Sequence, residues 1–284
     1  MSQTNTLHQK TRSSIKISNS GTGMRAGSQT PVIKPLTLTR TIIYTLVPAL
    51  ILYLTHYYLV PAYVGKTGTP YFQGYLLGYV ATMALFFIAA MVAFLQEGNT
   101  RTWQAFKLRY RLRKMNRGDW WWILGAIAIT LLAYFGLSST GNWVQSVSFL
   151  APREAWPAEF GPGGMAHLTS GEFMGMPLKG HWGIVLVYFL GWFLNIFGEE
   201  FWFRGYLLPR QEISFGRSAW LVNSLMFTFN HLWQPWIMLA ILPACLLLVY
   251  VVQKRRNTSI SIIQHGVVNI SLLFYLVAGV IGSG

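Results

Sequence analysis

The sequence predicts an all-α protein, a polytopic bundle of about seven membrane-spanning helices that follows a disordered N-terminal tail. Hydrophobic residues make up 53% of its 284 residues and charged residues only 11%, whereas soluble globular proteins carry about 25% charged residues. A chain with so little polar surface cannot cover itself in water, so we expect it to lie in a lipid bilayer. Its single cysteine, Cys245, excludes a disulfide framework and a zinc site built from cysteines.

Residues 1–41 differ sharply in composition from the rest of the chain. They are rich in Ser, Thr, Gln and Asn and contain no acidic residue. Such a segment cannot bury enough apolar surface to offset the entropy of ordering it, and we predict a disordered basic tail. The tail does not resemble a cleaved secretory signal, because no short apolar stretch follows a charged start, but an organelle transit peptide stays open.

Seven apolar segments follow, each near the roughly 20 residues that a spanning helix needs. The second contains a GxxxG motif at Gly74 and Gly78, which predicts close packing against a neighbouring helix. The fifth and sixth are short and form either a tight hairpin or a partly re-entrant pair. The predicted segments are 42–64, 72–95, 120–137, 182–200, 219–233, 236–252 and 258–281.

The basic residues indicate how the segments are oriented. The chain has 22 Lys and Arg against 8 Asp and Glu, for a net charge of +14, but they cluster between the apolar segments and therefore indicate no nucleic-acid partner. When seven spans alternate, all basic residues except Lys66, Arg153 and Lys179 fall on one side. The positive-inside rule then predicts a cytoplasmic N-terminus in a multi-pass integral protein, which we expect in the plasma membrane.

Two acidic residues lie within an apolar run. Charged groups inside hydrocarbon cost about 2.5–3.5 kcal/mol each on the mildest scale, so those kept there are candidates for function. Glu200 lies one helical turn before Arg204, and we predict that the two pair. Glu199 points about 100° away, with no cation on its face. Glu199 is therefore the better candidate for a general base.

Three histidines also fall in apolar segments. His265 and Asn269 are four residues apart, so they project from one face of the last span. His231 ends the run that starts at Phe227 in the fifth span. His56 has no second polar group at helical spacing, and we predict a packing role for it. Because three segments each carry costly polar groups, we expect a shared polar site in the inner half of the bilayer.

These motifs resemble those of the CPBP family of intramembrane proteases, which includes the type II CAAX prenyl endopeptidases. The EExxxR motif stands at residues 199–204, FxxxH at 227–231 and HxxxN at 265–269, in the order of the family. The resemblance covers about residues 182–282. The expected regions are therefore the tail (1–41), the first helices with an outer loop (42–181), and a CPBP-like catalytic core (182–284).

The resemblance implies a chamber in the bundle that hydrolyses peptide bonds of membrane-associated peptide or protein substrates, prenylated CAAX-type proteins among them. Glu199 and His231 would activate a water molecule, while His265 and Asn269 would stabilise the oxyanion. The residues that support these groups would be Glu200, Arg204 and Phe227.

Three alternatives stay open. Two histidines and a glutamate could ligate a divalent metal such as zinc, as in a metalloprotease, although no HExxH motif is present. Intramembrane Glu and His groups also form proton relays, so a proton- or ion-coupled transporter is the main functional alternative, even though no inverted repeat relates the two halves. A non-catalytic immunity or scaffold member of the family is the third.

Overall fold

The structure, a computed structural model, describes residues 33–147, 150–152, 156–162, 164 and 171–282. The chain divides into two units, Met1–Thr30 and Pro31–Gly284, and every described residue belongs to the second. The predicted tail lies outside the described residues as far as residue 32. The account below therefore concerns the second unit alone.

The first helix begins before the predicted boundary at residue 41. Helix α1 (Leu38–Leu54) is capped by Thr37, whose side chain accepts the Arg40 N–H at 3.3 Å. Upstream of the cap, Leu36 is 1% exposed and its N–H donates to the Arg210 carbonyl. The apolar Leu36 side chain orders this stretch because it joins the core, which a composition dominated by polar residues does not reveal.

Six segments are long and apolar enough to cross a membrane, by length and composition. Their outward faces carry large apolar side chains, among them Leu132 and Leu186, each 70% exposed, as expected where lipid surrounds the helices. The all-α, membrane-spanning prediction is confirmed. The segments are Leu38–Thr67, Tyr71–Gln96, Arg117–Gly136, Trp182–Trp233, Pro235–Arg255 and Ser259–Ile281.

Several of these segments contain more than one helix. After α1, the helices of the first three segments are the π-helix η1 (Thr55–Leu59), α2 (Val60–Thr67), α3 (Tyr71–Gln96) and α5 (Arg117–Gly136). Those of the last two segments are the 3₁₀ turn η7 (Pro235–Ile237), α10 (Met238–Arg255), α11 (Ser259–Asn269) and α12 (Ser271–Ile281).

The fourth segment, Trp182–Trp233, joins the predicted fourth and fifth spans. Its 52 residues would extend about 78 Å as a straight helix, well beyond a bilayer core of about 30 Å. The chain instead turns at Gly216, which has φ +54°. In order, its elements are α7 (Trp182–Glu199), the π-helix η4 (Glu200–Leu207), α8 (Leu208–Phe215), η5 (Gly216–Ser218), α9 (Ala219–Phe229) and η6 (Asn230–Trp233).

Buried polar contacts hold this hairpin closed. The Asn223 amide on α9 donates to the Phe203 carbonyl at 3.0 Å and to Gln211 Oε1 at 2.8 Å. Residues 20 positions apart can meet in this way only if the chain has reversed. The reversal brings α9, which carries the second polar motif, back toward the end of α7, which carries the first.

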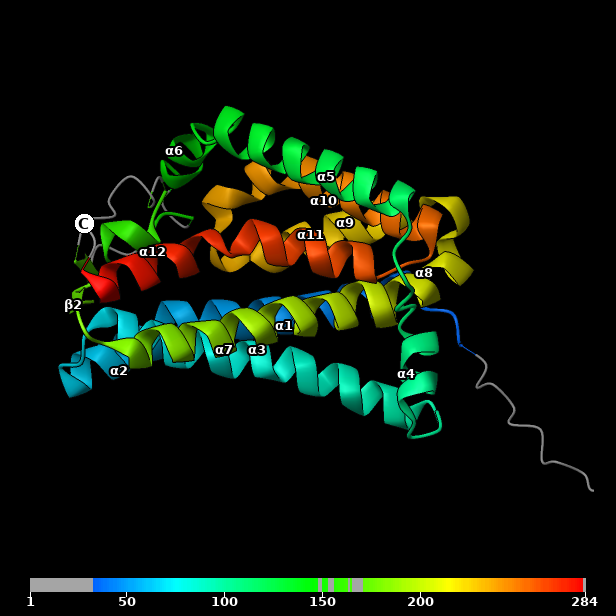
Figure 1. Ribbon diagram of the computed structural model, residues 1–284, viewed down its shortest axis with the longest axis horizontal. Helices are drawn as coiled ribbons and strands as arrows, with labels where there is room; N and C mark the ends of the chain where they lie inside the picture. The colour runs from blue at the N-terminus through cyan, green and yellow to red at the C-terminus, as the bar shows by residue number, and fades with distance from the viewer. Residues whose placement is uncertain (1–32, 148–149, 153–155, 163, 165–170, 283–284) are drawn as a thin grey trace, which may run out of the picture. The chain divides into compact units, whose positions relative to one another are not determined.

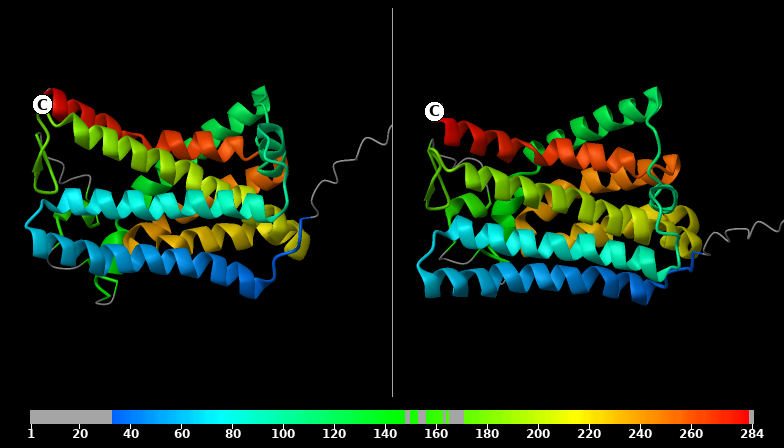
Figure 2. Two further views of the ribbon diagram at one scale, coloured as in Figure 1. Left: turned by 90° about the horizontal axis from the view of Figure 1, so that it is seen from below. Right: turned by 60° about the horizontal axis from the view of Figure 1, so that its bottom comes forward.

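Helix α7 lies between α3 on one side and α11 with α12 on the other (Figures 1 and 2). Gly198 lets the backbones of α7 and α3 approach, since a Cβ there would lie 3.1 Å from the Met83 carbonyl oxygen. The predicted GxxxG packing is confirmed as well. A Cβ at Gly74 or Gly78 would lie 2.8 Å from a valine methyl of α2.

The connections between the spans contain short elements. Helix α4 (Trp103–Arg109) runs across the end of the bundle where α3 stops and where α5 and α11 start (Figure 1); we call this the basic end. The opposite end carries α6 (Thr140–Gln145), η2 (Ala158–Phe160) and a two-stranded antiparallel hairpin of β1 (Glu172–Phe173) and β2 (Met176–Pro177).

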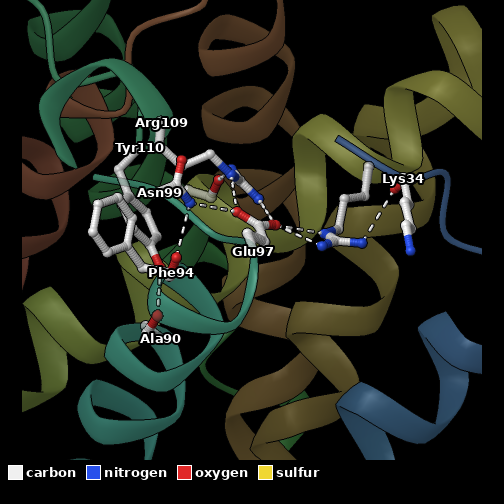
Figure 3. Close-up of polar contacts among 9 residues, drawn as sticks. Lys34, Ala90, Phe94, Glu97, Asn99, Arg109 and Tyr110 are labelled. Atoms are coloured by element: carbon white, nitrogen blue, oxygen red, sulfur yellow. Dashed lines mark hydrogen bonds and ion pairs between the residues drawn. The ribbon is translucent and has the colours of Figure 1, made fainter. Parts of the chain in front are cut away.

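A shared carboxylate fixes the basic end. Glu97 accepts hydrogen bonds from Arg109 on α4, at 2.5 and 2.6 Å, and from Arg210 on α8, at 2.5 and 3.2 Å (Figure 3). Burial raises the pKa of the Glu97 carboxyl, but the hydrogen bonds and charges of the two arginines outweigh it and hold that pKa below its ordinary value. Arg109 also donates to the Gly205 carbonyl at 2.8 Å, which ties α4 to η4.

Candidate functional site

The two glutamates lie where α7 becomes π-helical. Glu199 ends α7 at 2% exposure, and Glu200 begins η4 with no exposed surface. Arg204 is equally buried, and its Nε lies 3.5 Å from Glu200 Oε2. The predicted pair of Glu200 and Arg204 is confirmed, and it lies within a π-helical segment, a form that is frequent at functional sites.

His265 lies between the two carboxylates. Its Nδ1 is 2.9 Å from Glu200 Oε1, and its Nε2 is 3.9 Å from Glu199 Oε2. An Nδ1–H that donates to Glu200 orients the ring so that Nε2 faces Glu199. The structure thus brings the first and third polar motifs together, although they are more than sixty residues apart in the sequence.

Phe227 joins the second motif to the other two. The Arg204 guanidinium carbon lies 3.8 Å from the centroid of the Phe227 ring, a close cation–π contact. The same ring packs edge-to-face against His231, at 5.0 Å between centroids, and against His265, at 6.2 Å. None of the three Arg204 guanidinium nitrogens has a hydrogen-bond partner among the described residues. The positive charge of Arg204 is therefore balanced by the Glu200 carboxylate and by the face of the Phe227 ring.

His231 is half-buried, in the 3₁₀ turn η6 that follows α9. Its Nδ1 lies 3.0 Å from the Phe227 carbonyl oxygen. Because a carbonyl only accepts, Nδ1 carries the hydrogen, and in the neutral ring Nε2 is an acceptor. His231 reaches the other motifs through the Phe227 ring, and no hydrogen bond joins it to Glu199 in the described chain.

The match with known families covers this part of the chain. A family model described as type II CAAX prenyl endopeptidase Rce1-like matches residues 181–271. The chain carries an Rce1-like domain. All three polar motifs fall inside the match, and the resemblance to CPBP intramembrane proteases is confirmed. No curated protein and no solved structure matches the chain.

At the level of the family, the Rce1-like domain supports an intramembrane protease of the CAAX type. Together with the six apolar segments, it makes the chain a multi-pass integral membrane protein. The matched residues extend from the start of α7 to the start of α12, so the site residues all lie within them.

Two further asparagines of the Rce1-like domain, Asn195 and Asn230, also reach the site, although the sequence analysis did not select them. Asn230 Nδ2 donates to Glu199 Oε1 at 3.3 Å. Asn269 Nδ2 donates at 3.3 Å to the side-chain oxygen of Asn195, which lies one turn before Glu199 on α7. The signal was available, because both asparagines interrupt apolar runs and carry a transfer cost of the same kind as the histidines.

The Rce1-like domain does not offer a metal centre. Within the part of the chain that the structure describes, no group of three or more His, Cys, Asp or Glu side chains is placed to hold a metal ion. The Phe227 ring packs against both imidazoles, and the Nδ1 atoms of His231 and His265 already contact the Phe227 carbonyl and Glu200. The metalloprotease alternative therefore finds no support in this geometry.

The third intramembrane histidine lies apart from these groups. His56 has no exposed surface, and its ring stacks on Trp233 at 4.5 Å with an interplanar angle of 25°. Tyr75 and Phe160 complete the aromatic surroundings. This environment agrees with the predicted packing role of His56.

Proposed function

We propose that the protein is an intramembrane endopeptidase that cleaves membrane-associated peptides or proteins, with prenylated CAAX-type chains as the first substrate class to test. The observation that carries the proposal is the contact of His265 with both Glu199 and Glu200 inside the segment that matches the Rce1-like family. A buried carboxylate beside an imidazole is a workable pair for water activation.

In this mechanism Glu199 is the general base. Its Oε2 lies 3.9 Å from His265 Nε2, so a water bound to this carboxylate would lie next to His265, the oxyanion donor. Glu199 takes a proton as the water oxygen attacks the carbonyl carbon, and His231 Nε2 supplies a second acceptor. Glu199 then returns the proton to the leaving amine as the carbon–nitrogen bond breaks, which yields one new carboxyl and one new amino terminus.

The oxyanion is stabilised by His265 and Asn269. For His265 Nε2 to donate to the oxyanion while Nδ1 donates to Glu200, both ring nitrogens must carry hydrogen. Asn269 Nδ2 donates one hydrogen to Asn195 Oδ1 at 3.3 Å. The second hydrogen of this amide group is left for the substrate oxygen. Preorganised donors of this kind are worth roughly 10²–10³ in kcat.

Glu200, Arg204, Phe227, Asn195 and Asn230 are positioning residues in this proposal. Glu200 orients His265, and Arg204 balances the charge of Glu200. Phe227 packs against Arg204, His231 and His265, while Asn230 fixes the Glu199 carboxylate. Each acts on a neighbouring side chain and not on the substrate.

The test uses the full chain reconstituted in proteoliposomes with a fluorogenic farnesylated peptide that ends in a CAAX sequence. We expect wild-type protein and a His181→Ala control, which changes an exposed histidine at the start of α7, to cleave it. Glu199→Gln and His231→Ala should each reduce cleavage by at least about 10³-fold while their melting temperatures stay near wild type.

Two results would contradict the proposal. The first is normal cleavage by both variants. The second is a Glu199-dependent proton flux across the vesicle membrane in the absence of Glu199-dependent cleavage. Cleavage is then absent both for the farnesylated peptide and for the membrane proteins of the host. The latter comparison uses mass spectrometry of new peptide termini in cells that produce wild-type or Glu199→Gln protein.

A further inference from the structure

A groove of about 410 Å³ opens at the basic end, between α4, the loop that follows it and the first turns of α11. Three cations line it, Lys107, Arg113 and Lys114, and all three are exposed. Its apolar wall includes Phe197 near the end of α7 and Ile262 on α11. The groove therefore combines a positive rim with a hydrocarbon wall.

The three groove cations have no acidic partner in the described chain. The acids of the basic end are already engaged, since Glu97 binds Arg109 and Arg210. Glu212 binds Arg111 through two contacts of 2.6 Å, and Asp119 binds Arg255 at 2.7 Å. The acidic residues of the basic end thus neutralise the neighbouring arginines and not the groove cations. The positive charge of the groove is left for a ligand.

The groove lies at the ends of the spanning segments, where lipid headgroups are expected to meet hydrocarbon. Helix α4 crosses the ends of the spanning helices (Figure 1), and its Trp103 side chain is 66% exposed, as is typical of tryptophan at a membrane interface. Lys107 Nζ lies 5.9 Å from the Trp103 ring centroid. Phe197 and Ile262 belong to spanning segments, so the apolar wall continues into the lipid-facing surface.

The loop that carries the cations is held in place. The Arg113 N–H donates to Asn257 Oδ1 at 3.2 Å, and the Arg111 carbonyl accepts the Thr258 N–H at 3.0 Å. Asn257 Oδ1 also accepts the N–H of Ser259 at the start of α11. The cationic loop and the first turn of α11 therefore form one preorganised wall, which reduces the entropy that a ligand must offset.

We propose that this groove binds an anionic phospholipid, with the phosphate between Lys107, Arg113 and Lys114 and an acyl chain along Phe197 and Ile262. A lipid fits better than an acidic peptide, because the apolar wall opens to the hydrocarbon region and its cations lie at headgroup level. Phe197 is two residues before Glu199, and Ile262 is three before His265. The bound lipid therefore braces α4, α7 and α11 directly beside the candidate site.

The experiment measures lipid binding to purified, delipidated full-length protein in a neutral maltoside detergent by native mass spectrometry. The probes are dioleoyl phosphatidylglycerol and, for comparison, dioleoyl phosphatidylcholine. We expect wild type to retain phosphatidylglycerol preferentially and to melt at a higher temperature with it. The triple variant Lys107→Gln, Arg113→Gln and Lys114→Gln should lose at least about tenfold in affinity for that lipid.

A matched control removes the same charge from exposed arginines outside the groove, Arg101, Arg117 and Arg217, and should keep the wild-type affinity. Equal losses in the control and the groove variant would overturn the proposal, since binding would follow net charge. It would also fail if phosphatidylcholine bound as well as phosphatidylglycerol, or if free glycerol phosphate or a soluble acidic peptide displaced the lipid at equal concentration. Melting without lipid checks that both variants fold, and none of these outcomes depends on protease activity.

Discussion

Replacing Glu97 by alanine removes the acceptor shared by Arg109 and Arg210. The side chains of these three residues are 11%, 5% and 11% exposed, so both guanidinium groups would stay largely buried without a counter-charge. Breaking a buried pair in this way costs about 3–5 kcal/mol. Glu97 caps the C-terminus of α3, where the helix dipole opposes a negative charge by about 0.5 kcal/mol, so we expect a net loss of about 3 kcal/mol.

The single cysteine gives a direct assay. Cys245 is 6% exposed, so a thiol-reactive fluorogenic dye should label it only as the bundle unfolds on heating. A loss of about 3 kcal/mol corresponds to a fall in melting temperature of roughly 6–12 °C for a domain of this size. Glu212→Ala should lower it less, because Glu212 binds one arginine, and Glu172→Ala at the exposed hairpin should leave it unchanged.

The contribution of Glu97 to the stability of the fold should also depend on pH. Because the arginines hold its pKa below the ordinary value, the stabilisation is complete above that ordinary value, near pH 4.3, and is lost as the pH falls through the lowered pKa. The difference in melting temperature between wild type and Glu97→Ala should thus be largest near neutral pH and shrink below pH 4. A Glu97→Ala protein that melts within about 2 °C of wild type at pH 7, or a pH-independent difference, would refute this reasoning.

Two further predictions use the same Cys245 assay. Glu200→Gln should lower stability by about 3 kcal/mol because it leaves Arg204 without its counter-charge, whereas Glu199→Gln should cost less; equal melting temperatures for the two variants would contradict the distinct roles given to the glutamates. Gly205→Ala should cost about 1–3 kcal/mol, because the new Cβ would lie within the Tyr110 ring volume. In the double variant with Tyr110→Ala, the combined loss should be smaller than the sum of the two single losses, and strictly additive effects would argue against the clash.

Local spacing was sufficient to predict part of the site. The four-residue separation of Glu200 and Arg204 predicted their pairing, and the same spacing placed His265 and Asn269 on one face. Spacing could not show that His265 contacts Glu200 more closely than Glu199, since that depends on how α11 packs against α7. His231 reaches the other motifs through the Phe227 ring, a contact that no sequence periodicity encodes.

The number of spans and the start of the bundle were also beyond what local sequence patterns can predict. Hydropathy located the apolar segments, but it could not show that α7 and α9 belong to one continuous helical hairpin, because the turn at Gly216 depends on backbone conformation. Leu36 lies in a segment of polar composition, and only its burial against later elements orders it. Tertiary contacts, more than local propensity, decided both points.

The length of the π-helix η4 also determines how α8 and α9 are rotated about the helix axis relative to α7. An α-helix turns about 100° per residue, so deleting one residue between Arg204 and Leu208 would rotate everything downstream relative to Glu199 by about that angle. Gln211 would then face away from Asn223, and the return helix that delivers His231 would lose its anchor. We therefore expect a one-residue deletion in this stretch to separate the second polar motif from the first.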